Sequence, residues 1–554
     1  MLAALLLLAA PDVGDALDDF KLKDAHRRIR SLASWKEAKA FVVVFLDTEC
    51  PLANLYLPTL AKLQRKGVQF VAISSSAHDP FNRVASHAEE RAIPFPVLKD
   101  FDGKVAGSFG ATRSPEAFLL DAKRVIRYKG RIDDQYAPGV RKPKPTRSDL
   151  GEAIDELLAG KKVSIPATEP VGCLIERMKL PEAKVDHARH VAPILQRRCQ
   201  ECHRPGQAGP FPLLAYEDAK KRSARIREAV LEERMPPWHA DPAHGAFQND
   251  RRLTGEERET LLTWIAQGCP KGDEKDLLPA KKWPEGWSIG KPDKVFSMAE
   301  EFSVPATGVM PYKRFTVDPG FKEDVWVEAA EARPGDRRVV HHVIVYFKAP
   351  GKELYERDGR TTTLVGWAPG DMPARYGAGM AKRIPAGSKL VFEVHYTPDG
   401  TVRKDRCSVG LVFAKRKPER EVETNILANL ALRLKAGDGD IREKLSYTFP
   451  ADAEILSFMP HLHLRGTSAR YELMRPDGKA ETLLAVPAYD FAWQSVYRFK
   501  APVKAPKGSV LTWAARWDNS ADNPRNPDAT KEVRWGLQTW DEMQNGWMEL
   551  VWDR

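Results

Sequence analysis

One motif in the sequence combines residue types and a spacing that specify a covalent cofactor. Cys199 and Cys202 are followed directly by His203, in the pattern C-x-x-C-H. The two thiols of this pattern form thioether bonds with a c-type haem, and the adjacent imidazole becomes an axial ligand of the iron. A zinc site would need a second pair of ligands close by, and none follows. A thioredoxin-like C-x-x-C would stand between a strand and a helix, whereas residues 191–196 predict a helix that leads into the motif.

The predicted haem iron needs a second axial ligand from farther along the chain. Met235, in the sequence Arg-Met-Pro-Pro-Trp, resembles the methionine–proline loop of class I cytochromes c, and methionine ligation raises the reduction potential. His239 and His244 are the alternative ligands. A helix predicted at 254–267 would complete a small all-α cytochrome c domain, to which we assign residues 185–275.

Histidines in the carboxyl half form a second set of candidate metal ligands. His461 and His463 are two residues apart, so on a strand both rings project from one face and can bind one ion. The neighbours His341 and His342 would point to opposite faces of a strand. They can share an ion only where that strand twists, bulges or ends. His395, in an alternating strand, offers a third nitrogen.

A thioether is the remaining candidate ligand in this half. Met543 follows Asp-Glu, and Met548 is the alternative. A soft sulfur ligand near the His-x-His pair would favour Cu(I). In order along the chain, His-His, His-Tyr, His-x-His and Asp-Glu-Met resemble the motifs of the copper type II, ascorbate-dependent monooxygenases, the family of peptidylglycine α-hydroxylating and dopamine β-monooxygenases.

This resemblance covers about residues 295–554 and implies two all-β, jelly-roll-like sandwich domains. Short alternating strands with Gly and Pro turns agree with such domains, which we place at 290–418 and 419–554. The resemblance implies that each domain holds one copper ion across a shared cleft. The ligands of the electron-transfer copper would be His341, His342 and His395, and those of the oxygen-binding copper would be His461, His463 and Met543.

The amino-terminal part carries a candidate thiol site. Cys50 follows the buried strand predicted at 41–46 and begins a helix, within a β-α-β-α-β-β-α order that resembles the thioredoxin-like fold of the redoxin group. We place this α/β domain at 17–165, with Pro115 at the cis-proline position. Ala53 stands where a thioredoxin has its second cysteine. A one-cysteine peroxidase, a pairing with Cys173, and a domain kept for docking or structure are all open.

Composition limits the remaining options for this chain of 554 residues. The net charge is +10, but the basic residues are scattered, so we expect no nucleic-acid partner. No segment has the ~18 uncharged apolar residues that a membrane-spanning helix needs. Residues 1–16 begin with an apolar run like that of a signal peptide, and 166–184 form a proline-rich linker. Because c-type haem is attached outside the bacterial cytoplasmic membrane, we expect an exported, periplasmic protein.

The three modules together predict an exported oxidoreductase with one haem c and two copper ions. It would be a monooxygenase that hydroxylates a C–H bond of a small molecule or peptide with O2, while the haem relays electrons from an ascorbate-like reductant or a redox protein. Two other functions stay open. One is haem and copper electron transfer or copper binding without oxygenase turnover; the other is a thiol antioxidant working through Cys50.

Overall fold

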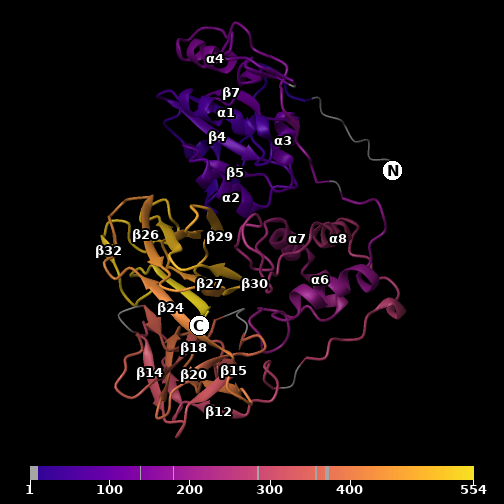
Figure 1. The fold of residues 1–554 in the computed structure, drawn as a ribbon. Helices are drawn as coiled ribbons and strands as arrows, with labels where there is room; N and C mark the ends of the chain where they lie inside the picture. The colour runs from indigo at the N-terminus through magenta and orange to yellow at the C-terminus, as the bar shows by residue number, and fades with distance from the viewer. Residues whose placement is uncertain are drawn as a thin grey trace.

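The computed structural model describes residues 10–137, 139–178, 180–283, 286–355, 359–368 and 373–553. Figure 1 shows an α/β domain, a group of helices and a large β-rich region that follow one another along the chain. Most of the predicted signal-like segment, residues 1–9, lies outside the described residues. Within the described ranges, no helix has the length and apolar character needed to span a bilayer.

The amino-terminal domain is built on a seven-stranded sheet in the order β2-β1-β5-β4-β3-β7-β8. Its central strand β3 is buried on both faces, as the continuous apolar run predicts. One face packs against α1 and α4, and a second apolar core covers the other face. The strands are β1 (Leu22–Asp24), β2 (Ile29–Arg30), β3 (Ala40–Phe45), β4 (Val68–Ser74), β5 (Val97–Lys99), β7 (Glu116–Asp121) and β8 (Ile126–Gly130); the helices are α1 (Pro51–Lys62), α2 (Phe81–Glu90), α3 (Lys104–Phe109) and α4 (Asp149–Leu158).

The middle of the chain is helical around the C-x-x-C-H motif. Helical residues run from His187 to Cys199, directly into the motif, and include α5 (Ala192–Ile194). The last helix, α8 (Gly255–Ala266), begins at a capping box in which Thr254 and Glu257 bond each other's backbone N–H groups. Between them lie α6 (Tyr216–Lys221) and α7 (Ser223–Leu231).

The carboxyl half is a β-rich region with several sheets. A long sheet runs through both of its parts in the order β12-β23-β15-β20-β24-β33-β27-β30, and the parallel pair β20–β24 joins them. Two four-stranded sheets, β14-β21-β16-β18 and β26-β31-β28-β29, accompany it, and each part has its own apolar core. The long-sheet strands are β12 (Lys294–Ser297), β15 (Val325–Arg333), β20 (Met380–Ile384), β23 (Ser408–Phe413), β24 (Arg420–Ala428), β27 (Ala453–His461), β30 (Tyr497–Ala505) and β33 (Asn545–Trp552). The four-stranded sheets comprise β14 (Lys313–Val317), β16 (Val340–Lys348), β18 (Thr363–Trp367), β21 (Lys389–Tyr396), β26 (Ile441–Thr448), β28 (Gly466–Met474), β29 (Ala480–Val486) and β31 (Val510–Trp517).

The helical group is fastened to the β region by an apolar wedge, which consists of Trp238 and Phe247. Both rings lie in the core of the second β part, where the Trp238 ring centroid is 4.9 Å from that of Tyr497. Phe247 pairs with Phe499 of β30 as an isolated bridge. Figure 1 shows the α/β domain beyond this junction, with α2 nearest the β region. The wedge thus makes one core from chain segments about 250 residues apart.

Candidate functional site

Three histidines meet where two antiparallel strands of the first β part lie side by side. His342 on β16 stands opposite His395 on β21, and a register shift between Val340 and His342 interrupts the pairing. This irregularity lets the neighbours His341 and His342 face the same space. One ring nitrogen from each of the three histidines lies within 4.8 Å of the others. His341 and His342 were expected to share an ion only where their strand twists, bulges or ends, and β16 has such an irregularity at this point.

The electrostatics of this cluster favour neutral imidazoles, the form that binds metals. Burial, together with the neighbouring imidazoles of His341 and His461, lowers the pKa of His395 to about 4. Burial likewise holds the pKa of His342 well below its ordinary value. The Nδ1 atom of His395 is buried and has no hydrogen-bond partner among the described residues. Since an unpaired buried nitrogen is costly, this donor set fits a metal ion.

The His-x-His pair lies at the end of β27 in the second β part. The ring centroids of His461 and His463 are 5.1 Å apart. Nδ1 of His461 lies 2.8 Å from Oε1 of Gln494, and Nδ1 of His463 donates to the carbonyl of Asp541 at 3.2 Å. These bonds orient both rings and leave the two Nε2 atoms available, an arrangement typical of metal-binding histidines.

A buried carboxylate holds the backbone around this pair. Glu542 accepts hydrogen bonds from the N–H groups of His463 and Arg465, at 2.9 and 2.6 Å, and from the indole N–H of Trp517. Burial raises the pKa of Glu542 to about 7, although the same N–H donors oppose that shift. Glu542 therefore acts as a positioning group for the turn that carries His463. No pattern in the sequence marks this role of Glu542.

The two candidate thioethers occupy different environments. Met543 precedes β33 and lines a cavity together with His461, and the amide of Asn545 lies 3.2 Å from its sulfur. Met548 lies within β33, where it is fully buried in the apolar core. The structure thus brings Met543, and not Met548, to the cavity that His461 lines.

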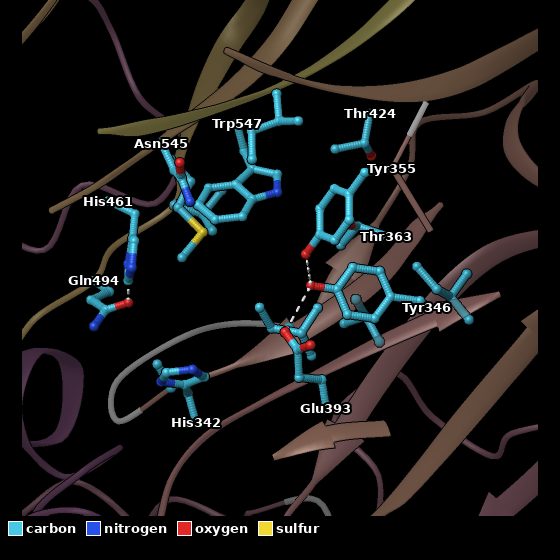
Figure 2. A pocket seen from close by; sticks show the side chains of 18 of the residues that line it. His342, Tyr346, Tyr355, Thr363, Glu393, Thr424, His461, Gln494, Asn545 and Trp547 are labelled. Carbon is cyan, nitrogen blue, oxygen red and sulfur yellow. Dashed lines mark hydrogen bonds between the residues drawn. The ribbon is translucent and has the colours of Figure 1, made fainter. Parts of the chain in front are cut away.

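This cavity, about 630 Å³, is shared by the two β parts. Figure 2 shows His461 with Gln494 at the left and His342 below them, with Trp547 above the space and Tyr346 and Tyr355 across it. Phe491 lies between the two histidine groups, with its ring centroid 5.4 Å from that of His341 and 5.6 Å from that of His463. The two predicted ligand sets therefore lie close together around one space.

Most of the cavity wall is apolar or aromatic, but two carboxylates also reach it. Glu393 accepts hydrogen bonds from Tyr346, at 3.3 Å, and from Arg314. Glu549 is paired with Lys382 at 2.8 Å. Although burial opposes its ionisation, Lys382 and other cationic neighbours hold the pKa of Glu549 at about 2. The cavity can therefore offer charged groups to the polar end of a bound molecule.

The C-x-x-C-H motif has the hydrogen bond expected of an axial histidine. His203 donates from Nδ1 to the carbonyl of Phe211 at 3.0 Å, which leaves Nε2 available to iron. Cys202 lines a second cavity of about 340 Å³, and Trp367 lines both this cavity and the larger one. The free Nε2 of His203 and the open space beside Cys202 are two features that a covalent haem would need.

The second axial ligand stays a prediction. Met235 follows α7, and its backbone N–H is bonded to the carbonyl of Ala229. Of the alternatives, His244 is engaged with Glu90, with 2.9 Å between Nε2 and the carboxylate. His239 is buried, and burial lowers its pKa to about 4.

The thiol site gains a second cysteine from the linker. Cys50 caps α1 and is buried, and its sulfur lies 2.9 Å from the carbonyl of Ser114 and 2.7 Å from the sulfur of Cys173. The Ser114–Pro115 peptide is cis, as its position in the sequence predicts. Burial raises the pKa of Cys173 to about 11, with a further contribution from Cys50. Of the options left open by the sequence, the structure has the arrangement needed for a pairing with Cys173.

Comparison with known proteins identifies this first domain. Residues 13–129 match the AhpC/TSA family. The amino-terminal domain is therefore a thioredoxin-like redoxin domain, of the kind found in thiol–disulfide oxidoreductases.

Two curated relatives each match about a fifth of the chain. The methylamine utilization protein MauD of Paracoccus denitrificans is 25% identical over 131 residues, which are 23% of this chain and 64% of that protein. The thiol–disulfide oxidoreductase ResA of Geobacillus thermodenitrificans is 27% identical over 113 residues, 20% of this chain and 63% of that protein. The chain thus spans less than two thirds of either relative.

Solved structures also match part of the chain. A hypothetical protein from Sinorhizobium meliloti is 30% identical, covers 30% of this chain and 96% of its own, and gives a TM-score of 0.28.

Proposed function

We propose that the chain is an exported monooxygenase that binds two copper ions and one haem c and hydroxylates a C–H bond with O2. One observation carries this proposal. His342, His461 and Met543 line a single cavity of about 630 Å³ between the two β parts. His341 and His395 lie beside His342, and His463 lies beside His461. Packing alone does not explain this group, because the buried Nδ1 of His395 has no hydrogen-bond partner among the described residues, and an unpaired buried polar atom is destabilising.

The six proposed ligands form two groups. His341, His342 and His395 would hold one copper ion, and His461, His463 and Met543 would hold the other. Copper bound by imidazole and thioether ligands supplies one-electron redox chemistry and activation of O2, and a haem on His203 supplies a store of electrons. The overall reaction consumes two electrons, R–H + O2 + 2e⁻ + 2H⁺ → R–OH + H2O, so an external donor is required. An ascorbate-like reductant or a redox protein would meet that need.

The other cavity residues orient the ligands and the substrate. Gln494 and the carbonyl of Asp541 fix the rings of His461 and His463, and Phe491 packs between the two histidine groups. The aromatic wall suits a small, mainly apolar molecule. Glu393 is placed to accept a hydrogen bond from the polar end of such a substrate.

The test is the metal content of the full chain, exported with haem maturation active and then loaded with copper. We expect about one iron and two copper ions per chain. His395→Ala and His461→Ala should each lose about one copper, whereas His190→Ala, outside the cavity, should keep both. A chain that retains haem but no tightly bound copper would refute the proposal.

Turnover separates the monooxygenase from the other redox functions. With a reductant and a candidate substrate, hydroxylated product should appear in proportion to the O2 consumed. Copper binding without any such product across a substrate screen would show an electron-transfer or copper-binding protein instead.

A further inference from the structure

Away from the copper cavity, a segment of the linker lies across the thiol site of the redoxin domain. We call residues 172–177 the strap. Its strand β11 (Cys173–Leu174) pairs antiparallel with β6 (Arg113–Ser114), directly before the cis peptide. Beyond β11, Ile175 donates to the carbonyl of Thr112 at 2.9 Å, and its side chain is buried in the domain core. The strap is thus built into the domain as an extra strand.

A glycine makes this close approach sterically possible. A Cβ atom on Gly172 would lie 2.1 Å from the carbonyl oxygen of Ser114 and 2.5 Å from its carbon. Real Cβ atoms do not approach backbone so closely, so any other residue would push the strap away. Gly172 directly precedes Cys173, and it therefore sets the position from which that sulfur reaches Cys50.

The two sulfurs differ in their access to solvent. Cys50 is 3% exposed and caps the amino end of α1, whereas Cys173 is exposed. A reagent from solution can therefore reach Cys173 first. Cys50 is enclosed by the domain, so attack from solution falls on the Cys173 sulfur and Cys50 is the sulfur that leaves.

We propose that Cys50 and Cys173 form a reversible disulfide, through which the redoxin domain exchanges electrons with external dithiols by way of the exposed Cys173. A thiolate of the external dithiol attacks the Cys173 sulfur, the Cys50–Cys173 bond breaks, and Cys50 leaves as a thiolate. The second external thiol, once deprotonated, attacks its own partner sulfur and releases the Cys173 thiolate, and both protein thiolates take up protons. The external dithiol is oxidised to a disulfide and the protein disulfide is reduced to two thiols. The reverse reaction with an external disulfide restores the protein disulfide.

This activity does not depend on copper or haem, and it departs from the C-x-x-C arrangement. Ala53 occupies the usual place of the second cysteine, and the linker supplies the missing thiol from 123 residues away. The substrate class is a protein or small molecule with two neighbouring thiols. The strap also occupies the edge beside the cis peptide, so a partner must approach from the side of Cys173.

The first experiment maps the disulfide in the full holoprotein. The protein is equilibrated with reduced and oxidised dithiothreitol at several ratios, its free thiols are alkylated, and its peptides are identified by mass spectrometry. We expect a peptide pair joined through Cys50 and Cys173 whose yield follows the dithiothreitol ratio. Cys269→Ser should leave that yield unchanged. The absence of the joined pair at every ratio would overturn the proposal.

Two glycine variants test the role of the strap. Gly172→Ala should lower the yield of the joined pair at least fivefold at a fixed ratio, because the clash separates the sulfurs. Gly255→Ala, whose added Cβ meets open space, should have no effect. An unchanged yield in Gly172→Ala would show that the strap does not control the pairing.

The order of attack is tested with single-cysteine variants and oxidised glutathione. Cys50→Ser should accumulate glutathione on Cys173, since no second thiol can displace it. Cys173→Ser, provided that its circular dichroism matches wild type, should react at Cys50 at least tenfold more slowly. Equal rates in the two variants would refute Cys173 as the entry point.

Discussion

Lys382 and Glu549 form a buried ion pair at the cavity, and we expect Lys382→Met to destabilise the β region. Lys382 Nζ lies 2.8 Å from Glu549, donates to the hydroxyl of Thr424 at 2.7 Å, and donates to the carbonyl of Thr363 at 3.0 Å. Its side chain is only 4% exposed. The pair joins β20 of the first β part to β33 of the second.

The expected magnitude follows from the ionisation of the partner. Methionine has nearly the length of lysine, so the substitution removes the charge and leaves little empty space. Lys382, Arg498 and Ser457 together outweigh burial and hold the pKa of Glu549 at about 2, against an ordinary value of 4.5, and this difference corresponds to ~3 kcal/mol of net favourable interaction. Breaking a buried pair by removing one partner typically costs about 3–5 kcal/mol. We therefore expect a loss of about 3 kcal/mol at pH 7.

The sign of the pH dependence is also determined. In the variant, the pKa of Glu549 rises from its wild-type value, because the charge of Lys382 no longer opposes the effect of burial. The carboxylate then takes up a proton at a higher pH than in wild type, and the destabilisation relative to wild type becomes smaller as the pH falls. In wild type, the contribution of the pair persists above pH 4.5 and is lost only as the pH falls toward 2.

Amide hydrogen exchange in β20 and β33 measures this effect without assuming that the whole chain unfolds in one step. The double variant Lys382→Met/Glu549→Gln should recover most of the protection, because no uncompensated charge remains. Lys389→Met, on the exposed end of β21, is the matched control and should exchange like wild type. If amide exchange in the double variant were as fast as in Lys382→Met, the unpaired charge of Glu549 would not be the cause of the destabilisation.

Three further predictions concern single side chains. Met543→Leu should weaken Cu(I) binding at least tenfold in a chelator competition, whereas Met548→Leu should leave the affinity unchanged; equal affinities would contradict a ligand role for Met543. His87, whose pKa burial lowers to about 4, is neutral when folded but takes up a proton below about pH 6.5 when unfolded. Stability of the redoxin domain should thus fall by up to ~3 kcal/mol between pH 6.5 and 4, and His87→Gln should flatten this slope in hydrogen exchange. Trp238→Ala should cost about 3–5 kcal/mol, seen as faster exchange in β30 but not in β16.

Much of the fold could be predicted because its signals are local. The apolar run of β3 and the helix behind Cys50 are readable from neighbouring residues, and the family match and the observed sheet confirm the redoxin domain. The β-rich character of the carboxyl half is likewise confirmed. The long sheet was beyond sequence reasoning, since nothing local specifies that β20 pairs with β24. The copper, the haem, their ligand roles and the domain boundaries stay predictions.

The candidate site shows where local reasoning ends. Spacing located the histidines and stated the condition for His341 and His342 to share a face, but the register shift that meets it depends on the partner strand β21. The choice between the two methionines also depends on the fold. Met543 lies before β33 and reaches the cavity, whereas Met548 lies within β33 and is buried. Phe491 lies in a loop that no motif marks. Its place between the histidines is a property of the folded chain.

The wedge of Trp238 and Phe247 has a consequence for movement within the molecule. An electron-carrier domain on a flexible linker reaches its partner domain by diffusion. Here the loop that follows Met235 is part of the neighbouring core, with Phe247 paired to a strand of that core. The helical group is thus held in a fixed position against the β region. Under the proposed function, the rate of electron transfer between the C-x-x-C-H motif and the cavity would depend on the distance between them and not on diffusion of one domain to the other.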